Sequence, residues 1–124
     1  MKKIIRILGF MLAVALTMKE ALLIARVTFS EANTESEKGQ RLVIDCILNR
    51  VDDDEFPDTV EEVINQKGQF SNFASEEEAK DFIPIVFEES NNRANTDVLW
   101  FRTDRYHIWG RRIIKEGNHY FSGR

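Results

Sequence analysis

The sequence predicts a mostly helical α+β domain that ends in a small β element. Up to about residue 91, apolar side chains recur at helical spacing, and hydroxyl residues followed three positions later by glutamate recur as signals for a helix start. After residue 95, β-branched and aromatic residues follow one another, which favours strands. The chain has 124 residues, of which 43% are hydrophobic, so it provides one core and one domain.

Residues 18–32 are predicted to form the first helix. Their apolar side chains make one wide stripe at helical spacing, and Asn33 interrupts the pattern. We therefore expect a central and largely buried helix. The stripe consists of Ala21, Ile24, Ala25, Thr28 and Ala32, widened by Leu22, Leu23, Val27 and Phe29.

A second helix is predicted over residues 35–49. Thr34-Glu35-Ser36-Glu37 has the form of a capping box, in which a hydroxyl cap is followed three residues later by glutamate. Cys46 lies within the apolar pattern of this helix, so we expect a small buried hydrophobe. It is the one cysteine of the chain, which excludes an intramolecular disulfide. The buried face is expected to carry Gly39, Val43, Cys46 and Ile47.

Two further capping boxes predict the next helices. Thr59-Val60-Glu61-Glu62 starts a short helix over residues 60–66, and Ser75-Glu76-Glu77-Glu78 starts a pattern that continues to about residue 91. Pro84 lies inside the second pattern. It should kink or split that helix, because proline lacks the backbone N–H that a helix interior uses.

The β element is expected from three short runs. Residues 98–102, Val-Leu-Trp-Phe-Arg, are β-branched and aromatic and predict a strand. Weaker candidates are residues 113–115 and 119–121, which flank the turn residues Gly117-Asn118.

The net charge is −4, so overall charge gives no reason to expect nucleic acid or anionic lipid as a partner. Acidic residues gather between Asp52 and Glu62, and basic residues gather between Arg102 and Arg124. We expect a solvated acidic loop and a solvated basic edge.

The first sixteen residues have the features of a secretory signal or an N-terminal membrane anchor. A basic start is followed by an apolar run and by Ala13-Val14-Ala15, although Arg6 weakens this pattern. The run is too short to span a bilayer comfortably. We therefore expect residues 1–16 to be a signal or anchor and residues 17–124 to be the folded domain. The alternative is a first amphipathic helix that packs on the domain.

Glu31 is the residue best suited to acid catalysis. It lies at the end of the first predicted helix, where Val27, Ile24 and Leu23 precede it at helical spacing. A carboxylate that continues an apolar stripe is partly desolvated, which raises its pKa. A protonated glutamate can give its proton to the leaving oxygen of a glycosidic bond. The pattern alone also fits a glutamate that turns into solvent at the helix end.

Other groups of residues give weaker indications of catalysis or metal binding. Glu35 offers a second carboxylate, but an acid is also favoured at that position because it begins the second predicted helix. His107, His119 and Asp104 are conceivable zinc ligands, and the familiar metalloprotease, redox and serine-hydrolase motifs are absent from the sequence. We expect neither a metal nor another cofactor.

An ordered series of motifs resembles the spore-cortex-lytic, or germination-type, cell wall hydrolase family. The resemblance covers about residues 18–121. It rests on A-R-x-x-x-x-E-A-x-x-E at residues 25–35, Gly39-Gln40, L-N-R-V at 48–51, F-P-x-T-V at 56–60, Val63-Ile64, Gln69-Phe70-Ser71 and G-x-H-x-F at 117–121.

The resemblance implies a lysozyme-like fold of the lytic-transglycosylase kind. It also implies cleavage of peptidoglycan between N-acetylmuramic acid and N-acetylglucosamine, by a lytic transglycosylase or a muramidase, with Glu31 as the general acid. The expected substrate-binding residues are Glu35, Gln40, Gln69, Phe70, His119 and Tyr120, with Gln40 supporting Glu31 from the second helix. The protein is expected to be a monomer that is secreted or held in the cell envelope, in a spore cortex, a vegetative wall or a phage.

Three other functions stay open on the sequence. The first is a non-catalytic peptidoglycan-binding or germination-partner protein with the same fold. The second is a metal-dependent amidase. The third is a nucleic-acid binder that uses residues 102–112.

Overall fold

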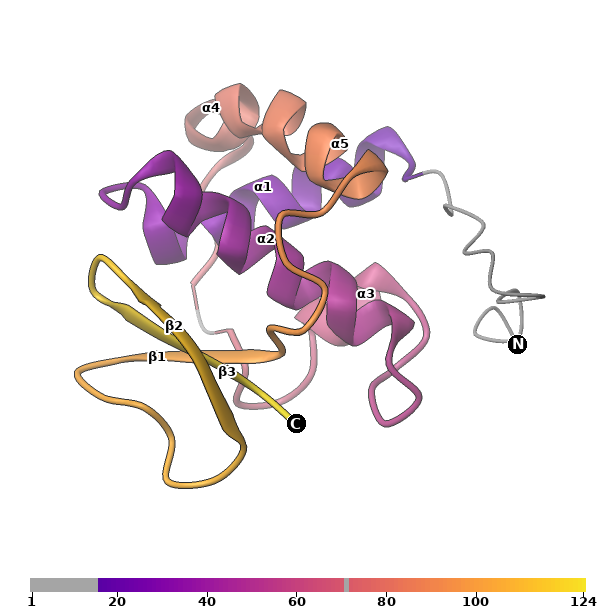
Figure 1. Ribbon diagram of the computed structural model, residues 1–124. Helices are drawn as coiled ribbons and strands as arrows, with labels where there is room; N and C mark the ends of the chain where they lie inside the picture. Colours follow the sequence, from indigo (N-terminus) through magenta and orange to yellow (C-terminus); the bar gives the residue numbers. More distant parts are fainter. Residues whose placement is uncertain (1–15, 71) are drawn as a thin grey trace.

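The computed structural model describes residues 16–70 and 72–124 (Figure 1). Two long helices, α1 (Met18–Ala32) and α2 (Glu37–Asp52), pack against each other in the middle of the molecule. The remaining helices cover them, and a three-stranded sheet lies on the other side of α2, at the lower left of Figure 1. This arrangement confirms the predicted mostly helical α+β class with a small C-terminal β element.

Helix α1 has the predicted bounds. Thr17 caps its first turn in a reciprocal capping box with Glu20, and Asn33 forms its C-cap. Six residues of the predicted apolar stripe are buried: Ala21, Ile24, Ala25, Val27, Thr28 and Ala32. The predicted central, buried helix is therefore confirmed.

The predicted start of α2 is wrong by two residues. Ser36, rather than Thr34, caps the helix, and its hydroxyl accepts a hydrogen bond from the N–H of Gly39. The N–H of Glu35 donates to the carbonyl of Ala32, so residues 33–35 complete the turn after α1 and cannot begin α2. Helix α2 also extends to Asp52, beyond the predicted end at residue 49.

The shorter helices follow the capping signals. Helix α3 (Val60–Ile64) starts after Thr59, and α4 (Glu76–Ala79) starts after Ser75. A 3₁₀ turn, η2 (Lys80–Phe82), then leads into α5 (Ile83–Asn91). Pro84 lies in the first turn of α5, where no N–H is needed, so the predicted split of this pattern is confirmed.

Two clusters of buried apolar residues hold the fold together. The larger one lies among the helices and includes Ile24, Ile47 and Val63. The smaller one joins α1 and α2 to the sheet through Val43, Cys46 and Phe121. Cys46 is the small buried hydrophobe that the sequence predicts, and burial raises the pKa of its thiol far above the usual range.

The sheet is antiparallel, with strand order β1-β3-β2. Strand β1 (Trp100–Thr103) starts two residues later than predicted, while β2 (Arg111–Glu116) and β3 (His119–Gly123) cover the weaker candidates. A β-bulge interrupts the pairing of β2 with β3 between Arg112 and Ile114. Gly117 takes a positive φ of 59° in the tight turn between β2 and β3.

The predicted signal or anchor falls almost wholly on residues 1–15, which lie outside the described residues. Leu16 is half-buried and packs against the helical core. No helix in residues 16–70 and 72–124 is long and apolar enough to cross a membrane.

Candidate active site

Glu31 lies in the last turn of α1, on the side of the molecule that faces the sheet and the 68–70 loop. Its side chain is half-buried, and in the described part of the chain it forms neither an ion pair nor a hydrogen bond. Burial raises the pKa of Glu31 above the usual value for glutamate, because desolvation penalises the charged form. The direction agrees with the expectation drawn from the apolar stripe of α1.

Glu31 lines an open cavity of about 430 Å³. Six of the residues that line it carry aromatic rings: Phe70, Trp100, Phe101, His107, Trp109 and His119. The other lining residues are Glu31, Arg50, Gly68, Gln69, Arg102 and Thr103. Glu31 is the one carboxylate among these lining residues, and aromatic faces suit the apolar faces of sugar rings.

The cavity brings together four of the seven predicted site residues. Glu31, Gln69, Phe70 and His119 line it, although they come from α1, the loop after α3 and strand β3. Glu35, Gln40 and Tyr120 are not among its lining residues.

Gln40 and Tyr120 have other contacts. The side-chain amide of Gln40 donates to the carbonyls of Ala32 at 3.2 Å and Glu35 at 3.1 Å, so it fastens the turn that follows Glu31. The ring of Tyr120 meets that of Tyr106 edge to face, with 5.1 Å between centroids.

Glu35, four residues after Glu31, has a lowered pKa, whereas the pKa of Glu31 is raised. Its carboxylate accepts hydrogen bonds from the backbone N–H of Asn118 at 2.9 Å and from the Asn118 side-chain amide at 3.0 Å. These bonds stabilise the charged form and lower the pKa of Glu35. Glu35 therefore ties the α1–α2 turn to the β2–β3 hairpin as an ionised acceptor.

Arg50 is a cavity residue that the sequence reasoning missed. It is buried, and its guanidinium donates to the carbonyl of Leu99 at 2.6 Å and to the side-chain oxygen of Gln69 at 2.9 Å. The rings of Phe56 and Phe70 lie within 5.2 Å and 5.6 Å of it. Arg50 thus fixes the amide of Gln69 at the cavity wall. The available signal was an arginine inside the apolar pattern of α2.

The loop between β1 and β2 supplies Trp109, a second cavity residue that the sequence reasoning missed. His107 stacks on Trp109 with 4.2 Å between centroids, and Trp109 meets Trp100 edge to face at 4.9 Å. Asp104 and Gly110, at φ 74° and 79°, turn the chain at the two ends of this loop. These two residues were the local signal for a loop that returns an aromatic residue to the cavity.

Both histidines have lowered pKa values. Desolvation lowers the pKa of His119, which is buried, and that of His107, beside which Arg102 acts in the same direction. The Nδ1 atom of His119 has no hydrogen-bond partner in the described part of the chain. Within residues 16–70 and 72–124 there is no group of three His, Cys, Asp or Glu side chains placed to hold a metal ion.

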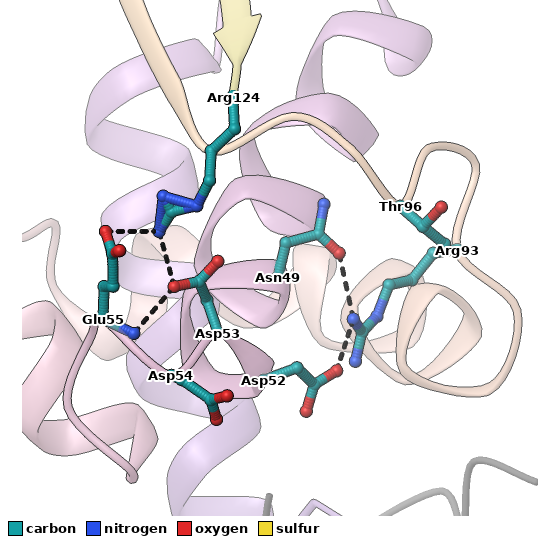
Figure 2. A pocket seen from close by; sticks show the side chains of 8 residues that line it. All are labelled: Asn49, Asp52, Asp53, Asp54, Glu55, Arg93, Thr96 and Arg124. Atoms are coloured by element: carbon teal, nitrogen blue, oxygen red, sulfur yellow. Dashed lines mark hydrogen bonds and ion pairs between the residues drawn. The ribbon is translucent and has the colours of Figure 1, made fainter. Parts of the chain in front are cut away.

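A second cavity, of about 390 Å³, contains the acidic stretch (Figure 2). Arg93 lies between Asn49 and Asp52, 2.9 Å and 2.6 Å away respectively. Arg124 contacts Asp53 at 2.6 Å and Glu55 at 3.1 Å. The acidic loop and the basic edge are largely exposed, as expected, and folding joins them at one point by bringing Arg124 to the end of α2.

Comparison with known proteins supplies a family and a fold. A family model described as cell wall hydrolase matches residues 34–122, a segment that begins after Glu31. The crystal structure of the catalytic domain of the *Bacillus cereus* SleB protein is similar with a TM-score of 0.70 and 24% sequence identity, over 92% of this chain and 98% of that chain. This likeness confirms the lysozyme-like fold. Comparison with curated protein sequences gave no match. Because the family model covers most of the domain, the chain belongs to the cell wall hydrolase family.

Proposed function

We propose that this protein cleaves the glycan strand of peptidoglycan between N-acetylmuramic acid and N-acetylglucosamine, with Glu31 as its catalytic acid. Membership of the cell wall hydrolase family supports cleavage of peptidoglycan. The environment of its side chain supports the role of Glu31. Glu31 is half-buried, its pKa is raised, and it is the one carboxyl among the rings and cations that line the 430 Å³ cavity. A glycosidase needs such a protonated acid beside the scissile bond.

The proposed reaction is that of a lytic transglycosylase. Glu31 donates its proton to the bridging oxygen as the bond from that oxygen to the anomeric carbon of the muramic residue breaks. The N-acetylglucosamine unit leaves with that proton on its new hydroxyl. The 6-hydroxyl of the same muramic residue then bonds to the anomeric carbon, and its proton passes to the Glu31 carboxylate. The acid is regenerated and the product is a 1,6-anhydro sugar.

This route needs one carboxylate, which agrees with the lining of the cavity. Both inverting and retaining hydrolysis use a second carboxylate near the sugar ring. The nearest candidate by sequence, Glu35, accepts two hydrogen bonds from Asn118 and is not among the lining residues. A muramidase reaction, in which water takes the place of the 6-hydroxyl, remains the second candidate.

The polar lining residues suit an acetamido sugar. Arg50 holds the side-chain oxygen of Gln69, which leaves the Gln69 amide N–H groups as donors for a substrate carbonyl. Neutral His119 offers either a donor or an acceptor, and Phe70 offers a ring face. We assign Glu35 and Gln40 a supporting role at the turn after Glu31. We further propose a monomer that acts in the cell envelope, exported or anchored through residues 1–16.

Mass spectrometry of fragments released from purified peptidoglycan tests the proposal. A lytic transglycosylase releases anhydromuramic ends, whereas a muramidase releases reducing ends that are heavier by one water. Release by the wild type but not by Glu31→Gln, with anhydro ends, is the expected result. Equal release by both proteins would remove Glu31 from the reaction. No release by either would favour a non-catalytic wall-binding protein.

A further inference from the structure

Strand pairing places a row of charged and aromatic side chains across one face of the sheet. Arg102 of β1 and Lys115 of β2 both pair directly with Tyr120 of β3. Residues directly opposite each other on antiparallel strands point to the same face, so these three side chains form one row.

The β-bulge adds Arg112 to the same face. Arg112 pairs with Ser122 and Lys115 pairs with Tyr120, and those two partners are two residues apart on β3 and share a face. Arg112 and Lys115, three apart on β2, would otherwise point to opposite faces. The extra residue at the bulge therefore brings both cations to one side of the sheet.

The other face of the sheet is turned toward the core. Phe101, Phe121 and Ile114 pack there against the cluster that joins the sheet to α1 and α2. Arg112 and Lys115 are exposed on the opposite side. We call that side, with Arg102, Tyr106, Tyr120, Arg112 and Lys115, the cationic face.

Aromatic rings hold the exposed cations in place. The guanidinium of Arg112 lies 5.1 Å from the centroid of Tyr106, and the ammonium of Lys115 lies 5.4 Å from that of Tyr120. The two rings are themselves in edge-to-face contact. The cations are therefore partly ordered before any ligand arrives.

The cationic face forms no ion pair in the described part of the chain. Arg102, Arg112 and Lys115 have no carboxylate at ion-pair distance within residues 16–70 or 72–124. Glu116 pairs with Lys38, and Asp97 pairs with Arg111. Glu35 is near enough for the charge of Lys115 to contribute to its lowered pKa, behind the hydrogen bonds from Asn118. In a chain of net charge −4, this excess of cations provides a local site for anions.

The cationic face is continuous with the cavity of Glu31. Arg102 lines that cavity and also belongs to the row across the sheet. Trp100, another lining residue, pairs with Ser122 and so lies on the same face. A polymer that occupies the cavity and leaves it past Arg102 would therefore pass over Tyr120, Lys115 and Arg112.

We propose that the cationic face binds the carboxylates of the peptidoglycan strand whose glycan occupies the Glu31 cavity, so that strands with charged stem peptides are bound more tightly. The inference rests on the proposed function and concerns its substrate class. Carboxylates complement guanidinium and ammonium groups. Phosphate polymers of the wall and nucleic acid would also be attracted to such a face. The peptidoglycan strand is favoured because, under the proposed function, its glycan occupies the adjoining cavity of Glu31.

Binding to insoluble peptidoglycan tests the proposal without turnover. Glu31→Gln protein is mixed with peptidoglycan from which phosphate polymers have been removed, and bound protein is measured by sedimentation. Adding Arg112→Gln and Lys115→Gln should weaken binding about 3- to 10-fold at low salt, because two exposed ion contacts are lost. The difference should vanish near 1 M salt, where such contacts are screened over about 3 Å.

The matched control changes two exposed lysines on the helical side, Lys19→Gln and Lys80→Gln, and should bind as the parent protein does. The charge-preserving pair Arg112→Lys and Lys115→Arg should restore binding, which separates lost charge from lost folding. Equal binding by the Gln pair and its parent at low salt would overturn the proposal.

The ligand is identified by changing the polymer. Converting the peptidoglycan carboxylates to amides should weaken binding of the parent protein to the level of the Gln pair. Undiminished binding after amidation would overturn the proposal. Binding that requires phosphate polymers, or that a DNA duplex abolishes at equal charge, would assign the face to those ligands instead.

Failure of the proposed function gives a different result. If the wild type releases no fragments while the charge dependence of binding holds, the catalytic proposal fails and the cationic face stands. If the wild type releases fragments but the Gln pair cleaves and binds charged peptidoglycan equally well, the cationic face fails alone.

Discussion

The acidic cavity at the end of α2 and the cavity of Glu31 surround their carboxyl groups with opposite environments. In the acidic cavity, Arg93 and Arg124 contact Asp52, Asp53 and Glu55 at 2.6–3.1 Å. In the other cavity, Glu31 lies among rings, and desolvation raises its pKa. Three acids of the first cavity are therefore engaged in ion pairs, whereas the carboxyl of Glu31 stands among rings without an ion pair in the described part of the chain. The environment of a carboxyl group, and not the number of acids, indicates where acid catalysis can occur.

The largest expected effect concerns Glu31 itself. We expect Glu31→Gln to reduce turnover of peptidoglycan by at least about 10²–10⁴-fold, the usual contribution of a general acid. Folding should be retained, since the change is nearly isosteric. The matched control is Asp54→Asn in the acidic cavity, which should change turnover less than about twofold. A similar loss of turnover in Glu31→Gln and Asp54→Asn would show that the Glu31 cavity has no special role in catalysis.

The pH dependence of kcat/KM should report the same carboxyl. Only protonated Glu31 can donate, so activity is present below its pKa and declines about tenfold per pH unit above it. Because burial raises that pKa, the decline should begin at a higher pH than an ordinary glutamate allows. A decline centred at or below the usual glutamate value would contradict the desolvated acid.

In the acidic cavity we expect a cost in stability without a cost in activity. Arg93→Met removes one partner each of Asp52 and Asn49, and the free energy of unfolding should fall by about 1–3 kcal/mol. Denaturant unfolding measures this change, and fragment release should stay at the level of the wild type. Lys19→Met is the control for loss of an exposed cation. If a folded Arg93→Met protein lost turnover, the acidic cavity would contribute to activity and the prediction would be wrong.

Asp45 and Glu89 form a third carboxyl environment, inside the protein. Asp45 is fully buried beside Glu89, and desolvation followed by the contact with Glu89 raises the pKa of Asp45 to about 9. Desolvation of Glu89 is outweighed by its contact with Asp45 and by hydrogen bonds from Ala94 and Arg41, so the pKa of Glu89 is lowered. Burial therefore favours the protonated form of Asp45, whereas the donors around Glu89 favour its charged form.

The smallest expected effect is a change in how stability depends on pH. Above the ordinary aspartate pKa the unfolded chain has released the Asp45 proton while the folded chain keeps it, so the free energy of unfolding falls as pH rises toward about 9. The slope is at most about 1.4 kcal/mol per pH unit. Asp45→Asn removes this proton and should flatten the slope in denaturant unfolding between pH 5 and 8, roughly where the two states differ. Parallel curves for both proteins would mean that Asp45 is ionised.

Much of the fold could be predicted because its signals are local. The apolar stripe of α1 and the caps Thr59 and Ser75 act through neighbours a few residues away, so their spacing in the sequence is enough. The start of α2 was missed because both Thr34 and Ser36 offer a hydroxyl. The choice depended on the bond between Glu35 and Ala32, which completes the turn after α1.

What the sequence by itself determined is the place of Glu31 at the end of the apolar stripe of α1, because that stripe is a local pattern. The rings that line the cavity of Glu31 come from segments far away in the sequence. The tertiary structure decided which partners the acids have. Glu35 meets Asn118 from 83 residues away, and Arg124 reaches Asp53 from 71 residues away. The bulge that brings Arg112 and Lys115 to one face likewise depends on β3. Such contacts join segments whose separation in sequence has no periodic signature, so only the packed chain brings them together.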